Sequence, residues 1–188
     1  MKKVLILAIA LVLIAAGGAF AGIVDSAHDL SSGSAGSKAN ENVTEICIVC
    51  HTPHNANTNT VPLWNHNNTT ASHTMYNSST LDAYAASVSG ISQACLSCHD
   101  GSVALEQYYG YSTTASTTLL TGNANLGVDL SDDHPVSISY NTTADGDLHT
   151  GALANAKLYS NKVECASCHA VHDDTESYFL RTSNVKSA

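Results

Sequence analysis

The chain has 188 residues, with 7 Lys and Arg against 16 Asp and Glu, which gives a formal net charge of −9. This balance excludes a surface of clustered cations for phosphate, so we expect no nucleic-acid partner. The chain has a single tryptophan, Trp64, and long stretches of Ser, Thr, Asn, Gly and Ala. Because such a composition rarely offsets the entropy lost on folding, either something besides side chains fills the interior or part of the chain is disordered.

Residues 1–21 are predicted to be a secretory signal peptide. Two lysines follow Met1, residues 4–16 form an unbroken apolar run, and residues 19–21 read Ala-Phe-Ala, a small-x-small cleavage site. The run is shorter than the roughly 20 residues of a spanning helix, so we expect no membrane span after cleavage. An uncleaved amphipathic anchor is the alternative. The mature chain, 22–188, is then one exported domain, extracellular or at the cell surface, or alternatively periplasmic.

Regular secondary structure is predicted to be short. One helix is expected over 81–88, and short helices are expected at the three motifs described next. The segment PVSISY, 135–140, alternates apolar and polar residues and is the best short strand. The predicted fold class is therefore mostly irregular, with short α-helices and minimal β-structure.

A Cys-x-x-Cys-His pattern occurs three times and uses every cysteine of the chain. Motif 1 is CIVCH at 47–51, motif 2 is CLSCH at 95–99 and motif 3 is CASCH at 165–169. A thioredoxin-like redox pair or a zinc site also uses Cys-x-x-Cys, but neither requires the following histidine. The full pattern is typical of c-type haem attachment, in which two thiols bond to the haem and the next histidine ligates its iron. Six cysteines divide into three such sites, whereas zinc sites of two pairs would leave one pair over.

We therefore expect three covalently bound haems c. Each takes two cysteines and the histidine that follows them, which gives three sets: Cys47, Cys50 and His51; Cys95, Cys98 and His99; Cys165, Cys168 and His169. Three apolar macrocycles would supply the interior that the composition lacks. The expected architecture is one domain, 22–188, wrapped around a row of three haems, and the haem-free chain is predicted not to fold.

The function depends on the ligand at the other face of each iron. An open position permits gas or peroxide chemistry, whereas a filled one gives an electron carrier. After signal removal the only methionine is Met75, so at most one haem can combine histidine with methionine. Seven histidines remain for three positions, which favours bis-histidine ligation: His28, His54, His66, His73, His134, His149 and His172.

Three candidates are placed by their distance along the chain from a motif or from the terminus. His54 and His172 each follow a motif histidine by three residues, so each is expected to reach toward a neighbouring haem. His28 lies near the mature N-terminus and is expected to reach the first haem or another subunit. His73 and His149 lie in Thr/Ser and Asp/Gly surroundings and are expected to be surface residues.

Two further candidates are indicated by their neighbours. His134 precedes Pro135, which restrains the backbone, and follows two aspartates that could orient its imidazole. His66 lies beside Trp64, which could pack on a porphyrin.

With these residues in view, the chain resembles the multihaem c-type cytochromes with repeated CxxCH motifs, and is similar to the secreted, filament-forming (nanowire) cytochromes of electroactive bacteria. The likeness spans nearly the whole mature chain, in the blocks AHDLSS, ICIVCHTPHNA, VPLWNH, YNSSTLDAY, CLSCHDGSVAL, DLSDDHPVSISY, VECASCHAVHD and YFLRTSN. One departure is CHAVH, where the family pattern has a proline before His172. The resemblance supports five candidates for the distal ligands: His28, His54, His66, His134 and His172. It also implies that subunits assemble into a homo-oligomeric filament in which one subunit lends a histidine to the next.

The leading functional hypothesis is extracytoplasmic electron transfer, without enzymatic activity, as a subunit of such a filament. A monomeric periplasmic shuttle that exchanges electrons with redox partner proteins is the alternative. A small haem reductase or peroxidase would need an open iron and cations for an oxyanion, and Arg181 is the sole arginine. A haem-storage or structural scaffold would not need the many spare histidines.

Overall fold

The computed structural model describes residues 22–32, 43–57, 60, 63–83, 85–108, 118–151, 153 and 155–183. The expected signal peptide lies outside these residues. The elements in chain order are α2 (Gly90–His99), η1 (Gly122–Ala124), β1 (Ile138–Ser139), β2 (Lys162–Val163), α3 (Cys165–Cys168) and η2 (Ser177–Phe179). The rest of the described chain forms turns, bends, isolated bridges and coil, which confirms the mostly irregular fold class. No helix in the described part is long and apolar enough to cross a membrane.

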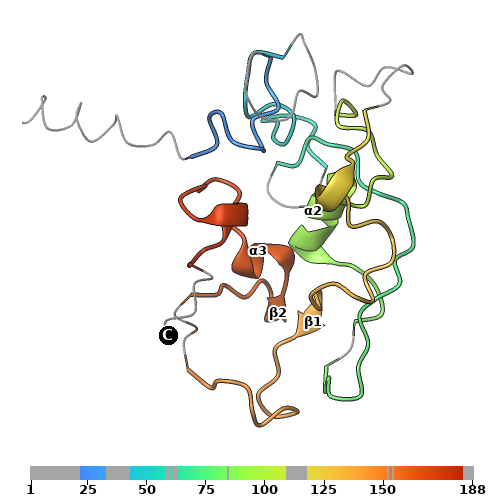
Figure 1. Cartoon of the computed structure of the whole chain (residues 1–188), viewed down its shortest axis with the longest axis vertical. Helices are drawn as coiled ribbons and strands as arrows, with labels where there is room; N and C mark the ends of the chain where they lie inside the picture. Colours follow the sequence, from blue (N-terminus) through green and yellow to red (C-terminus); the bar gives the residue numbers. More distant parts are fainter. Residues whose placement is uncertain are drawn as a thin grey trace, which may run out of the picture.

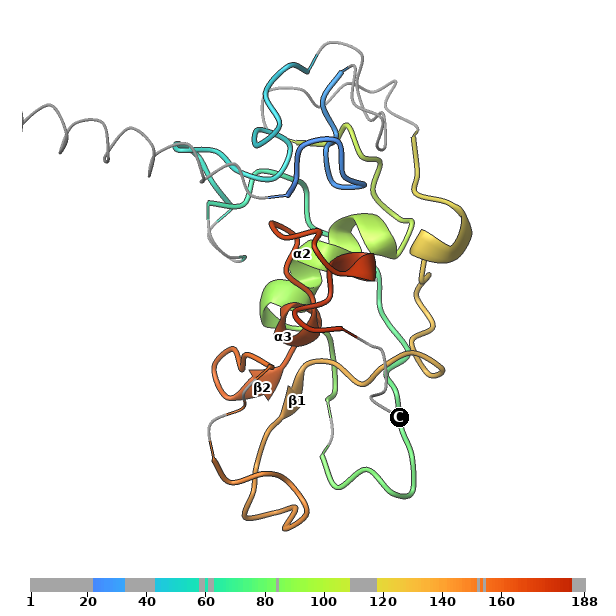
Figure 2. The same cartoon turned by 60° about the vertical axis from the view of Figure 1, so that its left-hand side comes forward.

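The two helices lie side by side in the middle of the molecule, and the two strands lie beyond α3 (Figures 1 and 2). Residues 22–32 and motif 1 occupy one end, and the loop that follows β1 occupies the opposite end. Motifs 2 and 3 are therefore central, because α2 contains the whole of motif 2 and α3 contains both cysteines of motif 3.

Two of the helix predictions need correction. Motif 1 forms a turn rather than a helix, closed by bonds from the amides of Cys50 and His51 to the carbonyl of Cys47, at 3.2 and 2.8 Å. The helix predicted over 81–88 is wrong for the residues described there, which are coil and bend. Of their apolar side chains only Ala85 is buried, and a short helix without packing is marginal in water.

The predicted strand is present but covers only two residues of 135–140. Ile138 and Ser139 of β1 pair antiparallel with Val163 and Lys162 of β2. Since β2 leads through Glu164 directly into α3, this small sheet anchors the start of motif 3.

The apolar core is small and lies against two of the motifs. Cys50 of motif 1 and Cys98 of motif 2 both pack against one cluster of buried side chains. That cluster consists of Leu30, Val43, Val49, Leu105 and Tyr108. Side chains far apart in the sequence thus bring the first two motifs to a single apolar surface.

A buried glutamate at the start of α3 is bonded to α2 and to the residue that precedes β1. Glu164 is 2% exposed, and its carboxylate accepts hydrogen bonds from the hydroxyls of Ser92, of Ser137 at 3.0 Å and of Ser89 at 3.3 Å. Ser92 lies in α2 and also accepts a bond from the amide of Cys165 at 2.9 Å. The two central motifs are therefore tied together by polar bonds as well as by helix packing.

Candidate functional site

The cysteines of successive motifs lie next to one another. Cys95 of motif 2 and Cys165 of motif 3 interact, and this interaction raises the pKa of Cys95 and lowers the pKa of Cys165. Burial raises the pKa of Cys98 to about 12, with a further contribution from nearby Cys50. None of the six cysteines, all of which the structure describes, is in a disulfide. Motif 2 therefore lies near motif 1 at Cys98 and near motif 3 at Cys95.

Two of the three motif histidines are oriented by backbone carbonyls. Nδ1 of His99 donates to the carbonyl of Ala124 in η1 at 2.7 Å, and Nδ1 of His169 donates to the carbonyl of Tyr178 in η2 at 2.7 Å. A hydrogen bond of this kind fixes the tautomer, so that the lone pair is on Nε2. Each imidazole is thus prepared to bind a metal through Nε2.

Two histidines from outside the motifs face motif histidines. The ring centre of His28 lies 6.0 Å from that of His99, and the ring centre of His172 lies 6.0 Å from that of His51. The sequence predicts that His172 reaches toward a neighbouring haem, and in the structure its ring lies against His51 of motif 1. His28 had been expected near the first motif or another subunit, but its ring lies against motif 2.

His28 is held by a compact turn. The buried carboxylate of Asp29 accepts bonds from the amides of Asp25, at 2.9 Å, and Ser31, at 3.1 Å. The His28 ring also packs edge-on against Phe179, with ring centres 4.5 Å apart. Burial, and after it the charge of His99, lowers the pKa of His28 to about 4, so the imidazole is neutral near pH 7. The neutral form is the one that ligates a metal.

His172 lies in an exposed turn that follows motif 3. The amide of Asp173 bonds to the carbonyl of Ala170 at 2.8 Å, and Asp173 in turn accepts bonds from the hydroxyl and amide of Thr175 at 2.6 and 3.1 Å. These bonds fix the backbone conformation of the turn, although it lacks the proline that the similar cytochromes have before this histidine.

His66 is buried with both ring nitrogens against backbone carbonyls. It is 1% exposed, and its Nδ1 lies 2.9 Å from the carbonyl of Asn67 while its Nε2 lies 3.1 Å from that of Ala104. Nε2 is also 3.8 Å from the sulfur of Cys98. In this arrangement His66 is beside motif 2 but has no free nitrogen for a metal.

The two remaining candidates, His54 and His134, are exposed. The backbone of His54 is fixed by Thr52, whose hydroxyl donates to the His54 carbonyl at 2.8 Å. Neither imidazole makes a hydrogen bond or a ring contact with any described residue. The structure therefore presents both side chains at the surface and brings neither to a motif histidine of the same chain.

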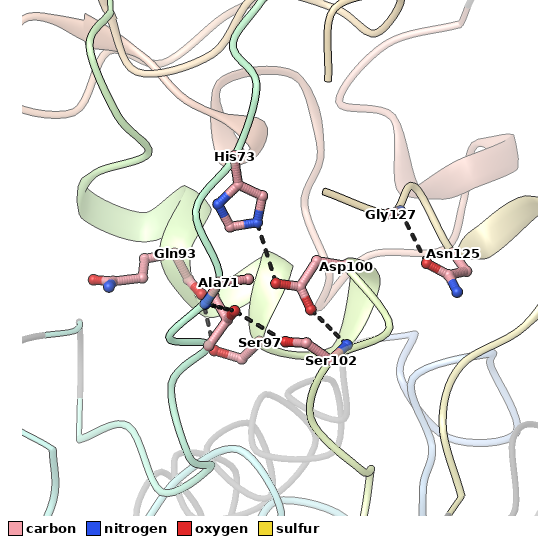
Figure 3. Close-up of polar contacts among 9 residues, drawn as sticks. Ala71, His73, Gln93, Ser97, Asp100, Ser102, Asn125 and Gly127 are labelled. Atoms are coloured by element: carbon pink, nitrogen blue, oxygen red, sulfur yellow. Dashed lines mark hydrogen bonds and ion pairs between the residues drawn. The ribbon is translucent and has the colours of Figure 1, made fainter. Parts of the chain in front are cut away.

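His73 is not the surface residue that the sequence indicated. Its side chain is 5% exposed, and Nε2 lies 3.1 Å from Oδ2 of Asp100, the residue that follows motif 2 (Figure 3). Asp100 also accepts a bond from the amide of Ser102 at 2.8 Å. Burial raises the pKa of Asp100, but hydrogen bonds from Thr69, Ser102 and His73 outweigh it and leave the pKa lowered. No local sequence signal identifies this pair.

The residues fit a covalently attached haem. Each motif supplies two thiols and an imidazole, and beside them two ring nitrogens, Nδ1 of His28 and Nε1 of Trp64, are buried with no hydrogen-bond partner among the described residues. The indole nitrogen is a donor that a carboxylate of a bound group would satisfy.

No cluster of three or more His, Cys, Asp or Glu side chains in the described ranges could hold a bare metal ion. A haem iron takes at most two ligands from the protein, so it does not require such a cluster.

Comparison of the sequence with protein-family models and with curated proteins found no match.

Proposed function

We propose that this protein transfers electrons outside the cytoplasm through three haems c, held by the cysteine pairs of motifs 1 to 3. The observation that carries this proposal is that motif 2 lies against both other motifs: Cys98 and Cys50 pack against one apolar cluster, and the amide of Cys165 bonds to Ser92 of α2 at 2.9 Å. Bound haem supplies an iron that takes up and releases one electron. The proximity of motif 2 to both other motifs supports electron transfer from its haem to either of the others.

The side chains of the site support electron transfer rather than catalysis. Histidines outside the motifs lie opposite His51 and His99, which favours filled axial positions over open ones. The sole arginine is already engaged, since Arg181 donates from Nε to the carbonyl of Ala166 at 2.9 Å and from Nη2 to the hydroxyl of Tyr159 at 3.3 Å. An oxyanion reductase needs cationic side chains directed at its substrate. The Arg181 guanidinium is instead bonded to the backbone of motif 3.

The finer proposal is that the protein is a subunit of an extracellular cytochrome filament, with a histidine from one subunit ligating iron in the next. The exposed imidazoles of His54 and His134, which have no partner among the described side chains, support this assembly. A monomeric periplasmic shuttle, serving redox partner proteins, is the second candidate.

Two measurements test the haem assignment and the electron-transfer function, and a third tests the assembly. Mass spectrometry of the mature polypeptide should show three haem adducts, and any other number would overturn the haem assignment. The reduced protein should have the sharp α-bands of low-spin haem, and carbon monoxide should not change them. A carbon-monoxide-sensitive fraction near one third would indicate an open iron and favour the reductase or peroxidase. Negative-stain microscopy of the secreted fraction distinguishes filaments from monomers.

A further inference from the structure

Two imidazole pairs in this structure have the spacing of axial ligands on one metal. Each pair combines a motif histidine with a histidine from elsewhere in the chain: His51 with His172, and His99 with His28, both with ring centres 6.0 Å apart. A metal–imidazole bond is about 2.0 Å long and a ring centre lies about 1 Å behind its nitrogen, so two imidazoles on opposite faces of one metal have centres about 6 Å apart. The observed separation matches this value in both pairs.

The hydrogen bonds around the second pair leave the required nitrogens available. His99 uses Nδ1 for the carbonyl of Ala124, so its Nε2 has no competing role. The imidazole of His28 makes no hydrogen bond with any described residue, and its Nδ1 is buried without a partner. A half-buried imidazole with no hydrogen bond is costly unless another group binds it. A metal between the two rings would provide that bond.

The other histidines are less suitable in this fold. Both nitrogens of His66 face carbonyls, and one nitrogen of His73 is engaged by Asp100. His54 and His134 have no ring contact with a motif histidine. All ten histidines lie in the described part of the chain, so the comparison covers every candidate.

We propose that His172 is the distal ligand of the iron bound by motif 1, and that His28 is the distal ligand of the iron bound by motif 2. This inference rests on the proposed function, since it assigns ligands to haems that the proposal requires. In this assignment both ligands come from the same chain as the motif histidines they face. His28 lies in the N-terminal turn and His172 in the segment after motif 3. Only His169 then lacks a facing imidazole within the chain, so a histidine lent by another subunit would be needed at motif 3 alone.

The test uses the mature, haem-loaded protein and three single variants. His172→Ala and His28→Ala should each retain three haems by mass spectrometry but convert one third of the haem from low-spin to high-spin in the electron paramagnetic resonance spectrum. The exposed histidine His149 provides the matched control, and His149→Ala should leave the spectrum unchanged. If His172→Ala or His28→Ala keeps three haems that give the spectrum of the parent protein, that ligand assignment is wrong. Fewer than three haems in the parent protein would instead contradict the proposed function.

A second set of variants assigns each histidine to its haem. In a protein that lacks the first attachment site, Cys47→Ala with Cys50→Ala, adding His172→Ala should produce no new high-spin haem. Adding His28→Ala to the same protein should make one of its two haems high-spin. The reverse pattern would overturn the pairing. If the two-haem protein does not fold, the test uses His172→Met and His28→Met in the three-haem protein, because methionine can still serve as the sixth ligand. Each variant should then have one haem with the far-red charge-transfer band of methionine ligation. Absence of that band would also refute the assignment.

Discussion

Replacement of Glu164 tests whether one carboxylate holds the two central motifs together. Glu164 is buried between α2, β1 and α3 and accepts bonds from Ser89, Ser92 and Ser137. Hydrogen bonds to a charged group contribute about 1.5–3 kcal/mol each. Removing the carboxylate also recovers several kcal/mol of its desolvation cost. We therefore expect Glu164→Ala to lower the free energy of unfolding by about 2–4 kcal/mol, less than the sum of the three bonds.

The assay is urea unfolding of the haem-loaded protein, followed by far-UV circular dichroism at matched haem content. For a chain of this size, about 2–4 °C of melting temperature corresponds to each kcal/mol, so the thermal shift should be about 4–16 °C. Glu45 is exposed and is the matched control, because Glu45→Ala should change the free energy of unfolding by less than about 0.5 kcal/mol. Glu164→Gln keeps one carbonyl acceptor and should fall between the two.

A free energy of unfolding for Glu164→Ala within about 1 kcal/mol of the parent would refute this reasoning. That result would mean that the three hydroxyls find other acceptors without loss. Ser137 is the hydroxyl best placed to do so, since it also lies 3.5 Å from the carbonyl of Ser89.

The remaining predictions concern the hydrogen bond between His73 and Asp100, the strained C-terminal turn and the haem itself. His73→Ala should cost about 1–3 kcal/mol of unfolding free energy. The fold lowers the pKa of Asp100, so the ionised carboxylate stabilises the folded state. This stabilisation is complete above the ordinary pKa of 3.8 and is lost as the pH falls through the lowered pKa. Acid unfolding of His73→Ala should therefore begin at a higher pH than that of the parent protein. Tyr178→Gly keeps the backbone carbonyl that orients His169 and removes the cost of a side chain at positive φ, so it should raise the melting temperature slightly. Tyr178→Val should lower the melting temperature, because a β-branched side chain is disfavoured at positive φ. The haem-free chain should show no cooperative thermal transition by circular dichroism, since its described apolar core is one small cluster; a native-like transition would contradict this.

The sequence supports predictions that depend on local chemistry. Haem attachment by Cys-x-x-Cys-His stays a prediction, and it depends on five consecutive residues, so it needs no knowledge of distant contacts. The irregular fold also follows from composition, because a chain with one tryptophan and few large apolar residues cannot bury long amphipathic elements. The alternation of 135–140 indicated the strand, although only Ile138 and Ser139 find a partner.

The sequence could not predict which histidines are exposed and which are buried. His73 and Asp100 are 27 residues apart, and His66 and Ala104 are 38 apart, so both contacts arise only when the chain folds. The surroundings of His73 are Thr and Ser, which suggested the surface, yet its partner follows motif 2. His66 was a candidate because of Trp64, but its nitrogens lie against the carbonyl of the next residue, Asn67, and that of Ala104, which follows α2 in the sequence.

The C-terminal turn acts on two of the proposed sites at once. Tyr178 and Phe179 both have positive φ, 59° and 57°, a conformation that costs a residue with a side chain on the order of 1–3 kcal/mol. The Tyr178 carbonyl accepts the Nδ1 proton of His169, while the Phe179 ring packs on His28. The turn is held in place by bonds from the amide of Ala170 to the carbonyl of Phe179 at 2.7 Å and from the amide of Arg181 to the carbonyl of Cys168 at 2.9 Å. Because these bonds maintain a strained backbone, the position of the histidine opposite motif 2 is linked to the orientation of the motif 3 histidine.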